Sequence, residues 1–200
     1  MDTRSIQKMM IDRRTKGFPG TAEPTLLKDI GKHCWNVLRE DMPLPLMVLK
    51  RSNLNHNSDI FAQYLESYDL SLAPHGKTTM SPQIFEEQIQ QGAWGITAAT
   101  IDQMQVMRHY GVDRVILANQ LVGKSNIQTV IAELNAYPEF EFFCFIDSVE
   151  QLQNIEGNLD VLNQTRPINV LVEIGAIGGR TGVRSKGTAL SLIEKIIERP

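Results

Sequence analysis

From residue 43 onward, short runs of apolar and β-branched residues alternate with longer stretches in which apolar residues recur every three or four positions. This alternation predicts strands joined by crossover helices, and therefore a parallel sheet. The stretches 58–68, 81–92 and 100–111 are expected to be helices, because each gathers its apolar residues on one face. The runs expected to form strands are 45–51, 70–76, 94–99, 114–119, 141–147 and 168–175.

Two architectures fit this pattern: an open doubly wound sheet and a (β/α) barrel. No Gly-x-Gly-x-x-Gly fingerprint and no Walker loop follows the predicted strands, which disfavours an open sheet that binds nucleotides. The active sites of barrels collect at the carboxyl ends of the strands. Five unusual runs of this sequence begin at such ends: APHGK, ITAAT, LANQ, FIDS and EIGAIGGRTG. We therefore predict an α/β fold of the (β/α)8 barrel type.

The length of the chain modifies this prediction. A barrel takes about 250 residues, whereas this sequence has 200 and ends at Pro200, just after a predicted helix. We therefore expect an incomplete barrel, with about five of the eight strands. We also expect the 200 residues alone to be inactive.

The composition describes an ordinary globular protein, with 42% hydrophobic residues, 22% charged residues and a net charge of -3. No apolar stretch approaches the roughly 20 residues of a membrane-spanning helix, and the amino-terminal residues lack the apolar core of a secretory signal. No basic cluster indicates a nucleic-acid partner. We therefore expect a cytoplasmic protein without membrane or nucleic-acid partners.

The cysteines and histidines do not predict a metal site in this chain. Cys34 and Cys144 are expected to be reduced thiols in the core, because two cysteines give no disulfide framework. The four histidines show no ligand spacing with cysteines or carboxylates.

Lys77 is the candidate catalytic residue that the local sequence indicates. It follows Pro74, His75 and Gly76 at the carboxyl end of a predicted strand, where a barrel would direct its ammonium group into the central mouth. Burial there would lower the pKa of a lysine from about 10.4 and make its amine a nucleophile toward aldehydes. A solvated lysine at a strand end is the alternative.

Five motifs in order carry a resemblance to a known family: LAPHGKTTMSPQ, GAWGITAAT, ILANQLVG, FIDSVEQ and LVEIGAIGGRTGVRS. With them the sequence, from Lys16 to its end, resembles the pyridoxal-phosphate enzymes of the alanine-racemase-like barrel type, in the group of D-serine dehydratases, D-threonine aldolases and amino-acid deaminases. The resemblance implies that Lys77 carries pyridoxal 5'-phosphate (PLP) as an internal aldimine. Thr79 and Met80 replace the His-Lys of many dehydratases and aldolases, and in this the sequence is similar to the deaminase branch.

The resemblance also implies how the chain is divided. Residues 1–52 would be an amino-terminal segment whose strand 45–51 joins a second, β-rich domain, and residues 53–200 would be the partial PLP-binding barrel. The rest of the barrel, the β domain and the ligands of a divalent metal would lie beyond residue 200. Relatives are homodimers when full length, so a homodimer is expected.

The remaining candidate residues carry two interpretations each. His75 would orient the cofactor or a substrate carboxylate, or be a histidine bonded to a backbone carbonyl. Arg180 is similar to the arginine placed near the phenolic oxygen of the cofactor; the alternative is a surface ion pair. Asn119 and Gln120 would contact substrate or cofactor, or only cap a turn.

Two acidic positions receive structural predictions only. Asp147 and Ser148 are expected to cap a helix. Glu173 would face the barrel interior and needs a partner, for which Arg180 is the candidate.

The expected function is that of a PLP-dependent lyase acting on D-amino acids, of the D-serine dehydratase or deaminase type, which yields a 2-keto acid and ammonia. D-threonine aldolase and amino-acid racemase are alternatives within the enzymes. A non-catalytic protein that binds PLP for homeostasis is the alternative from another class, although the Pro-His-Gly-Lys-Thr run disfavours it.

Overall fold

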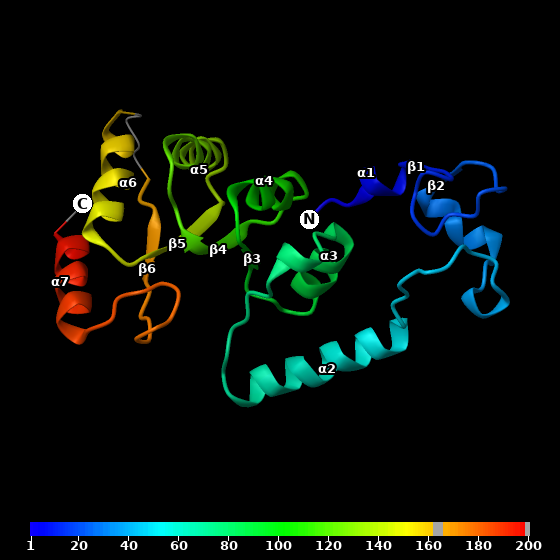
Figure 1. Cartoon of the computed structure of the whole chain (residues 1–200), viewed down its shortest axis with the longest axis horizontal. Helices are drawn as coiled ribbons and strands as arrows, with labels where there is room; N and C mark the ends of the chain where they lie inside the picture. Colours follow the sequence, from blue (N-terminus) through cyan, green and yellow to red (C-terminus); the bar gives the residue numbers. More distant parts are fainter. Residues whose placement is uncertain (162–165, 199–200) are drawn as a thin grey trace. The chain divides into compact units, whose positions relative to one another are not determined.

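The computed structural model describes residues 1–161 and 166–198, and the chain divides after Leu70 into two compact units, Met1–Leu70 and Ser71–Pro200 (Figure 1). Each unit is described by itself.

The first unit consists of short elements followed by one long helix. Strands β1 (Met10–Ile11) and β2 (Thr25–Leu26) pair antiparallel, with Met10 opposite Leu26. Its helical elements are α1 (Arg4–Gln7), the 3-10 helices η1 (Leu27–His33) and η2 (Val37–Arg39), and α2 (Arg51–Ser67). Its buried apolar residues are Ile6, Ile11 and Phe18, so the core of this unit is small.

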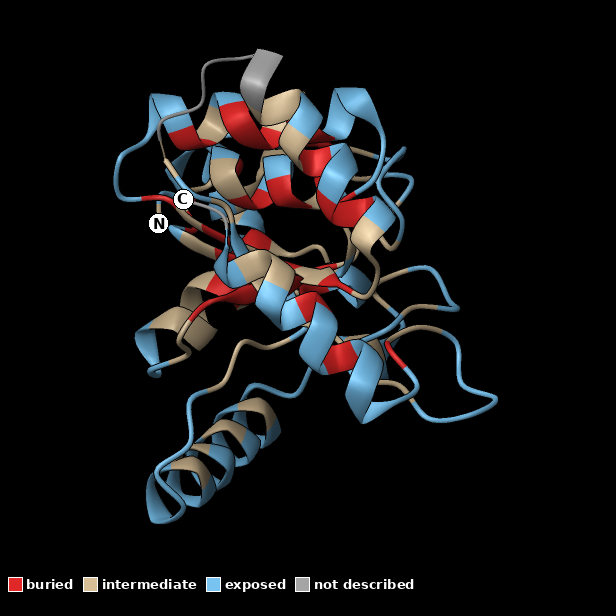
Figure 2. Cartoon of the chain, turned by 90° about the vertical axis from the view of Figure 1, so that its left-hand side faces the viewer, coloured by how far each residue is buried: buried red, intermediate tan, exposed pale blue. Residues whose placement is uncertain are grey.

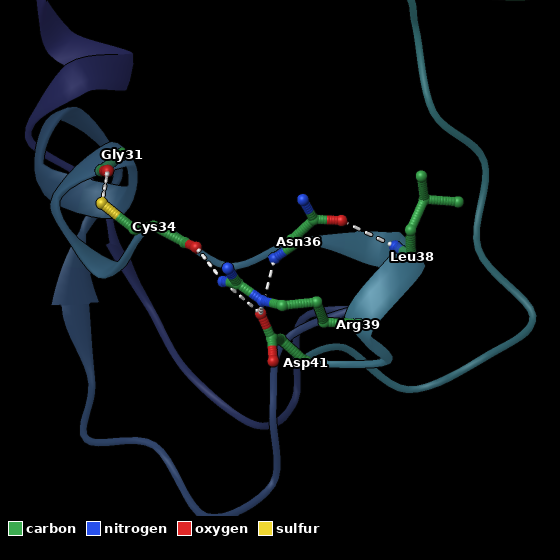
Figure 3. Close-up of polar contacts among 6 residues, drawn as sticks. All are labelled: Gly31, Cys34, Asn36, Leu38, Arg39 and Asp41. Atoms are coloured by element: carbon green, nitrogen blue, oxygen red, sulfur yellow. Dashed lines mark hydrogen bonds and ion pairs between the residues drawn. The ribbon is translucent and has the colours of Figure 1, made fainter.

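A polar loop connects η1 with η2 (Figure 3). The Asp41 carboxylate accepts hydrogen bonds from the Asn36 backbone N–H at 2.8 Å and from Nη2 of Arg39 at 2.8 Å. The same Nη2 donates to the carbonyl oxygen of Cys34 at 2.8 Å. Cys34 has a left-handed backbone with φ of 52° and is exposed. The prediction of a core thiol is therefore wrong for this residue, because the residue lies in a turn outside the core.

The predicted strand 45–51 is absent. Residues 45–50 form no strand, and α2 begins at Arg51 instead of residue 58. A strand needs a hydrogen-bonding neighbour, and no described strand pairs with this segment; Pro45 also lacks an N–H. None of the side chains of α2 is buried, and its aromatic residues contact one another along the helix, with the Tyr64 and Tyr68 ring centroids 4.8 Å apart and the rings tilted by 44°.

The second unit contains a parallel sheet of four strands in the order β3 (Ile96–Ala98), β4 (Arg114–Gln120), β5 (Glu141–Ile146) and β6 (Asn169–Val172). Its helical elements are η3 (Gly76–Thr78), α3 (Pro82–Gln90), α4 (Ile101–His109), α5 (Lys124–Ala136), α6 (Val149–Val161) and α7 (Lys186–Ile197). The predicted α/β class with a parallel sheet is confirmed. Within the described residues the sheet is open, with β3 and β6 at its edges.

The strands alternate between a covered face and an open face. In β5, Phe142, Cys144 and Ile146 are buried, whereas Phe143 and Phe145 between them are only half-buried. β4 repeats the alternation. Figure 2 shows the buried residues gathered where the helices meet the sheet. Helices therefore cover one face, and residues at positions 143, 145 and 147 lie along the other.

The predicted strand 70–76 exists only as a segment beside β3. Its one described bridge joins His75 to Thr97, in parallel orientation. The Thr97 N–H donates to the carbonyl oxygen of Pro74 at 2.8 Å, and the Trp94 N–H donates to that of Leu72 at 2.7 Å. Pro74 has no N–H to return a bond, so the ladder is interrupted. Of the five barrel strands expected, four are therefore regular.

The helices α3 and α4 lie within the predicted ranges 81–92 and 100–111. The Thr100 hydroxyl accepts a hydrogen bond from the Gln103 N–H at 3.4 Å and so caps α4. Gly92 and Gly111 follow α3 and α4 with positive φ of 94° and 80°.

Candidate functional site

Lys77 lies in the turn η3, which follows the segment beside β3. The preceding Gly76 is buried, and a Cβ atom at its position would lie 2.6 Å from Cε of Met107, 2.9 Å from Cε1 of Phe85 and 3.0 Å from Cγ2 of Ile96. The backbone before Lys77 is therefore pressed against the core, which fixes the base of the side chain.

The Lys77 side chain itself is exposed. The prediction that the fold buries this amine is wrong for the described residues, because Lys77 lies in an exposed turn. In residues 1–161 and 166–198, Lys77 forms no ion pair. Its amine is accessible and uncommitted.

His75 is held by the strand beside it. Its Nδ1 lies 3.1 Å from the carbonyl oxygen of Thr97, and 3.5 Å from the backbone N–H of Lys77. A carbonyl oxygen only accepts, so we assign the hydrogen to Nδ1 on the basis of the shorter contact. Nε2 of the neutral ring is then an acceptor. The predicted bond to a backbone carbonyl is present, and it fixes the ring without using its second nitrogen.

Asn119 and Gln120 differ in their surroundings although they are adjacent. The Asn119 side chain is exposed; its Oδ1 accepts from the N–H of Gln120 at 3.0 Å, and its Nδ2 lies 3.4 Å from the carbonyl oxygen of Ala99. These are the local contacts of a turn residue.

Gln120 instead lies at the centre of a polar cluster. Its Nε2 donates to Oδ2 of Asp147 at 3.1 Å and to Oε2 of Glu173 at 2.9 Å. The three side chains follow or end β4, β5 and β6 at their carboxyl ends. The sequence predicts that Asp147 and Ser148 cap a helix. The prediction is confirmed for Ser148, whose Oγ accepts from the N–H of Gln151 at 3.2 Å, whereas the Asp147 side chain contacts Gln120.

The loop 175–184 carries Arg180. The Arg184 guanidinium donates to the carbonyl oxygens of Thr181 at 2.5 Å and Gly179 at 2.7 Å. A Cβ atom on Gly175 would collide with this guanidinium. Gly175 is therefore required by close packing within the loop.

Arg180 is exposed, and it forms no ion pair within the part of the chain that is described. The predicted pairing with Glu173 is wrong, because Glu173 uses one carboxylate oxygen for Gln120 and the other for the Thr181 hydroxyl at 2.7 Å.

The structure thus places the candidates at the carboxyl ends of the strands, but in separate groups. Lys77 and His75 lie beside β3, Gln120 ends β4, and Arg180 follows β6. The sequence analysis did not predict that Asp147 and Glu173 form a cluster with Gln120. The signal that could have shown it is that both acidic residues directly follow strands and lie on the same face of the sheet. No three His, Cys, Asp or Glu side chains gather at metal-binding distance in the described ranges.

No described helix is long and apolar enough to cross a membrane.

The known proteins similar to this chain include enzymes of two kinds, D-threonine aldolase and D-threo-3-hydroxyaspartate dehydratase. No protein-family model matches the chain. The D-threonine aldolase of Arthrobacter sp. is 23% identical over 156 residues, which cover 78% of this chain and 40% of that protein. The solved structure of D-threonine aldolase from Filomicrobium marinum matches with a TM-score of 0.71 and 24% identity, over 79% of this chain and 41% of its own.

A second solved structure, D-threo-3-hydroxyaspartate dehydratase from Delftia sp. HT23, matches with a TM-score of 0.61 and 19% identity, over 70% of this chain and 36% of its own. The chain therefore spans well under half the length of these relatives. In sequence and in fold, the chain resembles the group of alanine-racemase-like enzymes that its motifs predict.

Proposed function

We propose that the chain is the cofactor-binding part of a PLP-dependent lyase that acts on D-amino acids bearing a β-hydroxyl group. The observation that carries this proposal is the exposed, uncommitted amine of Lys77 at the carboxyl edge of a parallel sheet, in a chain similar to D-threonine aldolase and D-threo-3-hydroxyaspartate dehydratase. The open sheet is proposed to belong to a (β/α)8 barrel of the alanine racemase type.

The residues present fit PLP in two respects. An aldehyde requires an accessible primary amine, and Lys77 offers one on a backbone fixed by the packing at Gly76. An electron-rich phenolic oxygen requires a cation, and Arg180 is an exposed guanidinium at the same edge of the sheet. We propose Lys77, His75 and Arg180 as the residues that hold the cofactor, and Asn119 as a candidate contact to substrate.

The chemistry of the site divides between cofactor and protein. When bound, PLP supplies an electron sink that stabilises negative charge at the substrate Cα. Nζ of Lys77 is proposed to take the α-proton. Nε2 of His75, whose ring is fixed by the Nδ1 contact to Thr97, is proposed to orient the ring or the substrate carboxylate. The positive charge of Arg180 is proposed to stabilise the phenolic oxygen.

The fate of the β-carbon separates the two reactions in the proposed class. Elimination expels the β-hydroxyl as water, and D-serine then gives pyruvate and ammonia. Aldol cleavage breaks the Cα–Cβ bond instead, and D-threonine gives glycine and acetaldehyde. We propose the dehydratase or deaminase type, supported by Thr79-Met80 after the lysine, with aldol cleavage as the alternative. A divalent metal with ligands beyond residue 200, a homodimer and a cytoplasmic location are also proposed.

The decisive experiment traps the cofactor on its lysine. The whole protein is incubated with PLP, reduced with borohydride and digested, and the modified peptide is identified by mass spectrometry. We expect a pyridoxyl group on Lys77, its loss in Lys77→Arg, and its retention in the control Lys124→Arg. A pyridoxyl group on another lysine, or none, contradicts the proposal.

A panel of D-serine, D-threonine and their L-enantiomers then separates the reactions. We expect a 2-keto acid and ammonia from D-serine and nothing from L-serine. Glycine and an aldehyde from D-threonine would identify the aldolase alternative. A trapped cofactor without turnover of any member of the panel would contradict the assignment as an enzyme.

A further inference from the structure

The cluster around Gln120 is built as a cross-link between strands. Gln120, Asp147 and Glu173 come from three neighbouring strand ends, all on the open face of the sheet. A side-chain amide nitrogen carries two N–H bonds, and here it donates to two carboxylates, at 3.1 Å and 2.9 Å. The neutral amide also separates two negative groups that would otherwise repel each other.

The two carboxylates continue the chain of contacts into the loop 175–184. Oδ2 of Asp147 accepts from the backbone N–H of Gly182 at 2.9 Å. Oε1 of Glu173 accepts from the Thr181 hydroxyl at 2.7 Å. Two consecutive residues of the loop are thus hydrogen-bonded to the strand ends. Each carboxylate contacts both Gln120 and the loop.

Hydrogen bonds hold the backbone on both sides of Arg180: the contacts to the strand ends follow it, and a contact within the loop precedes it. Thr181 and Gly182 follow it, and Gly179, whose carbonyl oxygen accepts from Arg184 at 2.7 Å, precedes it. The backbone of Arg180 is therefore fixed, while its side chain is exposed. A residue with a fixed backbone and a free charged side chain is pre-organised for a ligand, because binding orders only the side chain.

We propose that Gln120 is a positioning residue that acts through Asp147 and Glu173 to hold the loop bearing Arg180 in its ligand-binding position. Gln120 in this assignment works through its amide nitrogen and not by contacting the substrate. The assignment rests on the proposed function for its effect on PLP, whereas its effect on the loop does not require the cofactor.

The test uses Gln120→Glu, which removes both N–H donors and keeps the side-chain shape. Hydrogen exchange of the peptide 174–185 is measured first, without cofactor, and PLP affinity is measured second. We expect the Gly182 amide to exchange at least tenfold faster and the Kd for PLP to rise at least tenfold. The control is Gln153→Glu on the exposed side of α6, which makes the same charge change away from the cluster and should leave both values within twofold.

A double variant distinguishes positioning from direct contact. Gln120→Glu combined with Glu173→Gln reverses donor and acceptor between these two side chains, and the oxygen at position 173 that accepts from the Thr181 hydroxyl is kept. Asp147 stays unchanged, because its Oδ2 accepts from both Gln120 and the Gly182 N–H, and an amide nitrogen there could not accept from Gly182. If Gln120 acts by positioning, the double variant slows the exchange of the peptide 174–185 and lowers the Kd for PLP by at least threefold relative to Gln120→Glu alone. Continued weak binding despite slowed exchange would show that the amide contacts the ligand, and would overturn the proposal.

Further outcomes keep the two proposals apart. Unchanged exchange in Gln120→Glu, in a protein whose wild type carries PLP on Lys77, overturns the positioning role alone. Absence of the cofactor from wild-type Lys77 contradicts the proposed function, while the exchange result still decides the role of Gln120. Should Gln120→Glu not fold, Thr181→Val removes one tie of the loop, and an exchange rate raised at least threefold is expected.

Discussion

Replacing Gly76 by alanine tests whether the core fixes the backbone that carries Lys77. A Cβ atom there would lie 2.6 to 3.0 Å from carbon atoms of Met107, Phe85 and Ile96, and all three side chains are fully buried. Carbon atoms in contact prefer separations of about 3.5 to 4.0 Å. The neighbours must therefore retreat by roughly 1 Å in a close-packed interior.

The expected cost follows from those contacts. Overpacking of this kind destabilises a protein by about 1–3 kcal/mol. Replacing glycine also restricts the unfolded chain, which stabilises by about 0.4–1 kcal/mol. The closest atom, Cε of Met107, is the end of a flexible side chain, whereas the Phe85 ring and Ile96 yield less readily. We expect a net loss of about 1–2 kcal/mol in the free energy of unfolding.

The measurement is urea unfolding followed by Trp94 fluorescence, in a Trp35→Phe background so that the signal comes from the second unit. The matched control is Gly157→Ala in α6, where a Cβ atom meets nothing within 4 Å. That change is expected to stabilise by about 0.5–1 kcal/mol, because alanine favours helix over glycine. Adding Met107→Leu to Gly76→Ala removes the closest atom and should recover part of the loss. Equal effects of Gly76→Ala and Gly157→Ala would refute the reasoning.

Three further predictions concern the two cysteines and a buried ion pair. Burial raises the pKa of the Cys144 thiol to about 12. This thiol should therefore stay protonated and unmodified by iodoacetamide at pH 8.5, whereas the exposed Cys34 reacts. Mass mapping of the labelled native protein checks this, and labelling of Cys144 in the native protein would contradict it. The same raised pKa means that ionising Cys144 favours unfolding, so stability should fall as the pH rises above about 9. The buried Arg108 guanidinium lies 3.6 Å from the Glu133 carboxylate. Arg108→Met leaves that carboxylate without its cation and should lower the free energy of unfolding, measured in urea, by about 3 kcal/mol. The double variant with Glu133→Met should lose less stability, and equal losses in the two variants would argue against the pair.

The regular part of the sheet was predictable because its strands carry their own signal. The runs at 114–119 and 141–147 alternate residues with distinct burial, and the structure has β4 and β5 at nearly those positions. The run 45–51 is equally apolar, yet it forms no strand. A strand forms only where a neighbouring strand accepts and donates its backbone hydrogen bonds, and the sequence of the run itself does not show whether such a neighbour exists.

The candidate site was predictable residue by residue but not as a set of contacts. The position of Lys77 just after a strand-like segment follows from local sequence. A backbone carbonyl contact was one of two interpretations of His75, but its partner, Thr97, lies 22 residues away. The partner of Glu173 does not follow from local sequence either, because Gln120 lies 53 residues away and reaches it across a strand. Charge alone suggested Arg180 as that partner, although a neutral amide already satisfies the carboxylate.

The loop 175–184 separates positions that tolerate change from positions that do not. Ile177 is 92% exposed, and Arg180 is also exposed. Gly175 packs against Arg184, and Gly182 has a φ of 92° and lies against the Gly175 backbone. A mutant library of this loop should therefore diversify position 177, keep both glycines, and keep Arg180 for its proposed role toward the cofactor. Selection on such a library would then explore chemistry at the tip of the loop while the fold of the loop stays constant.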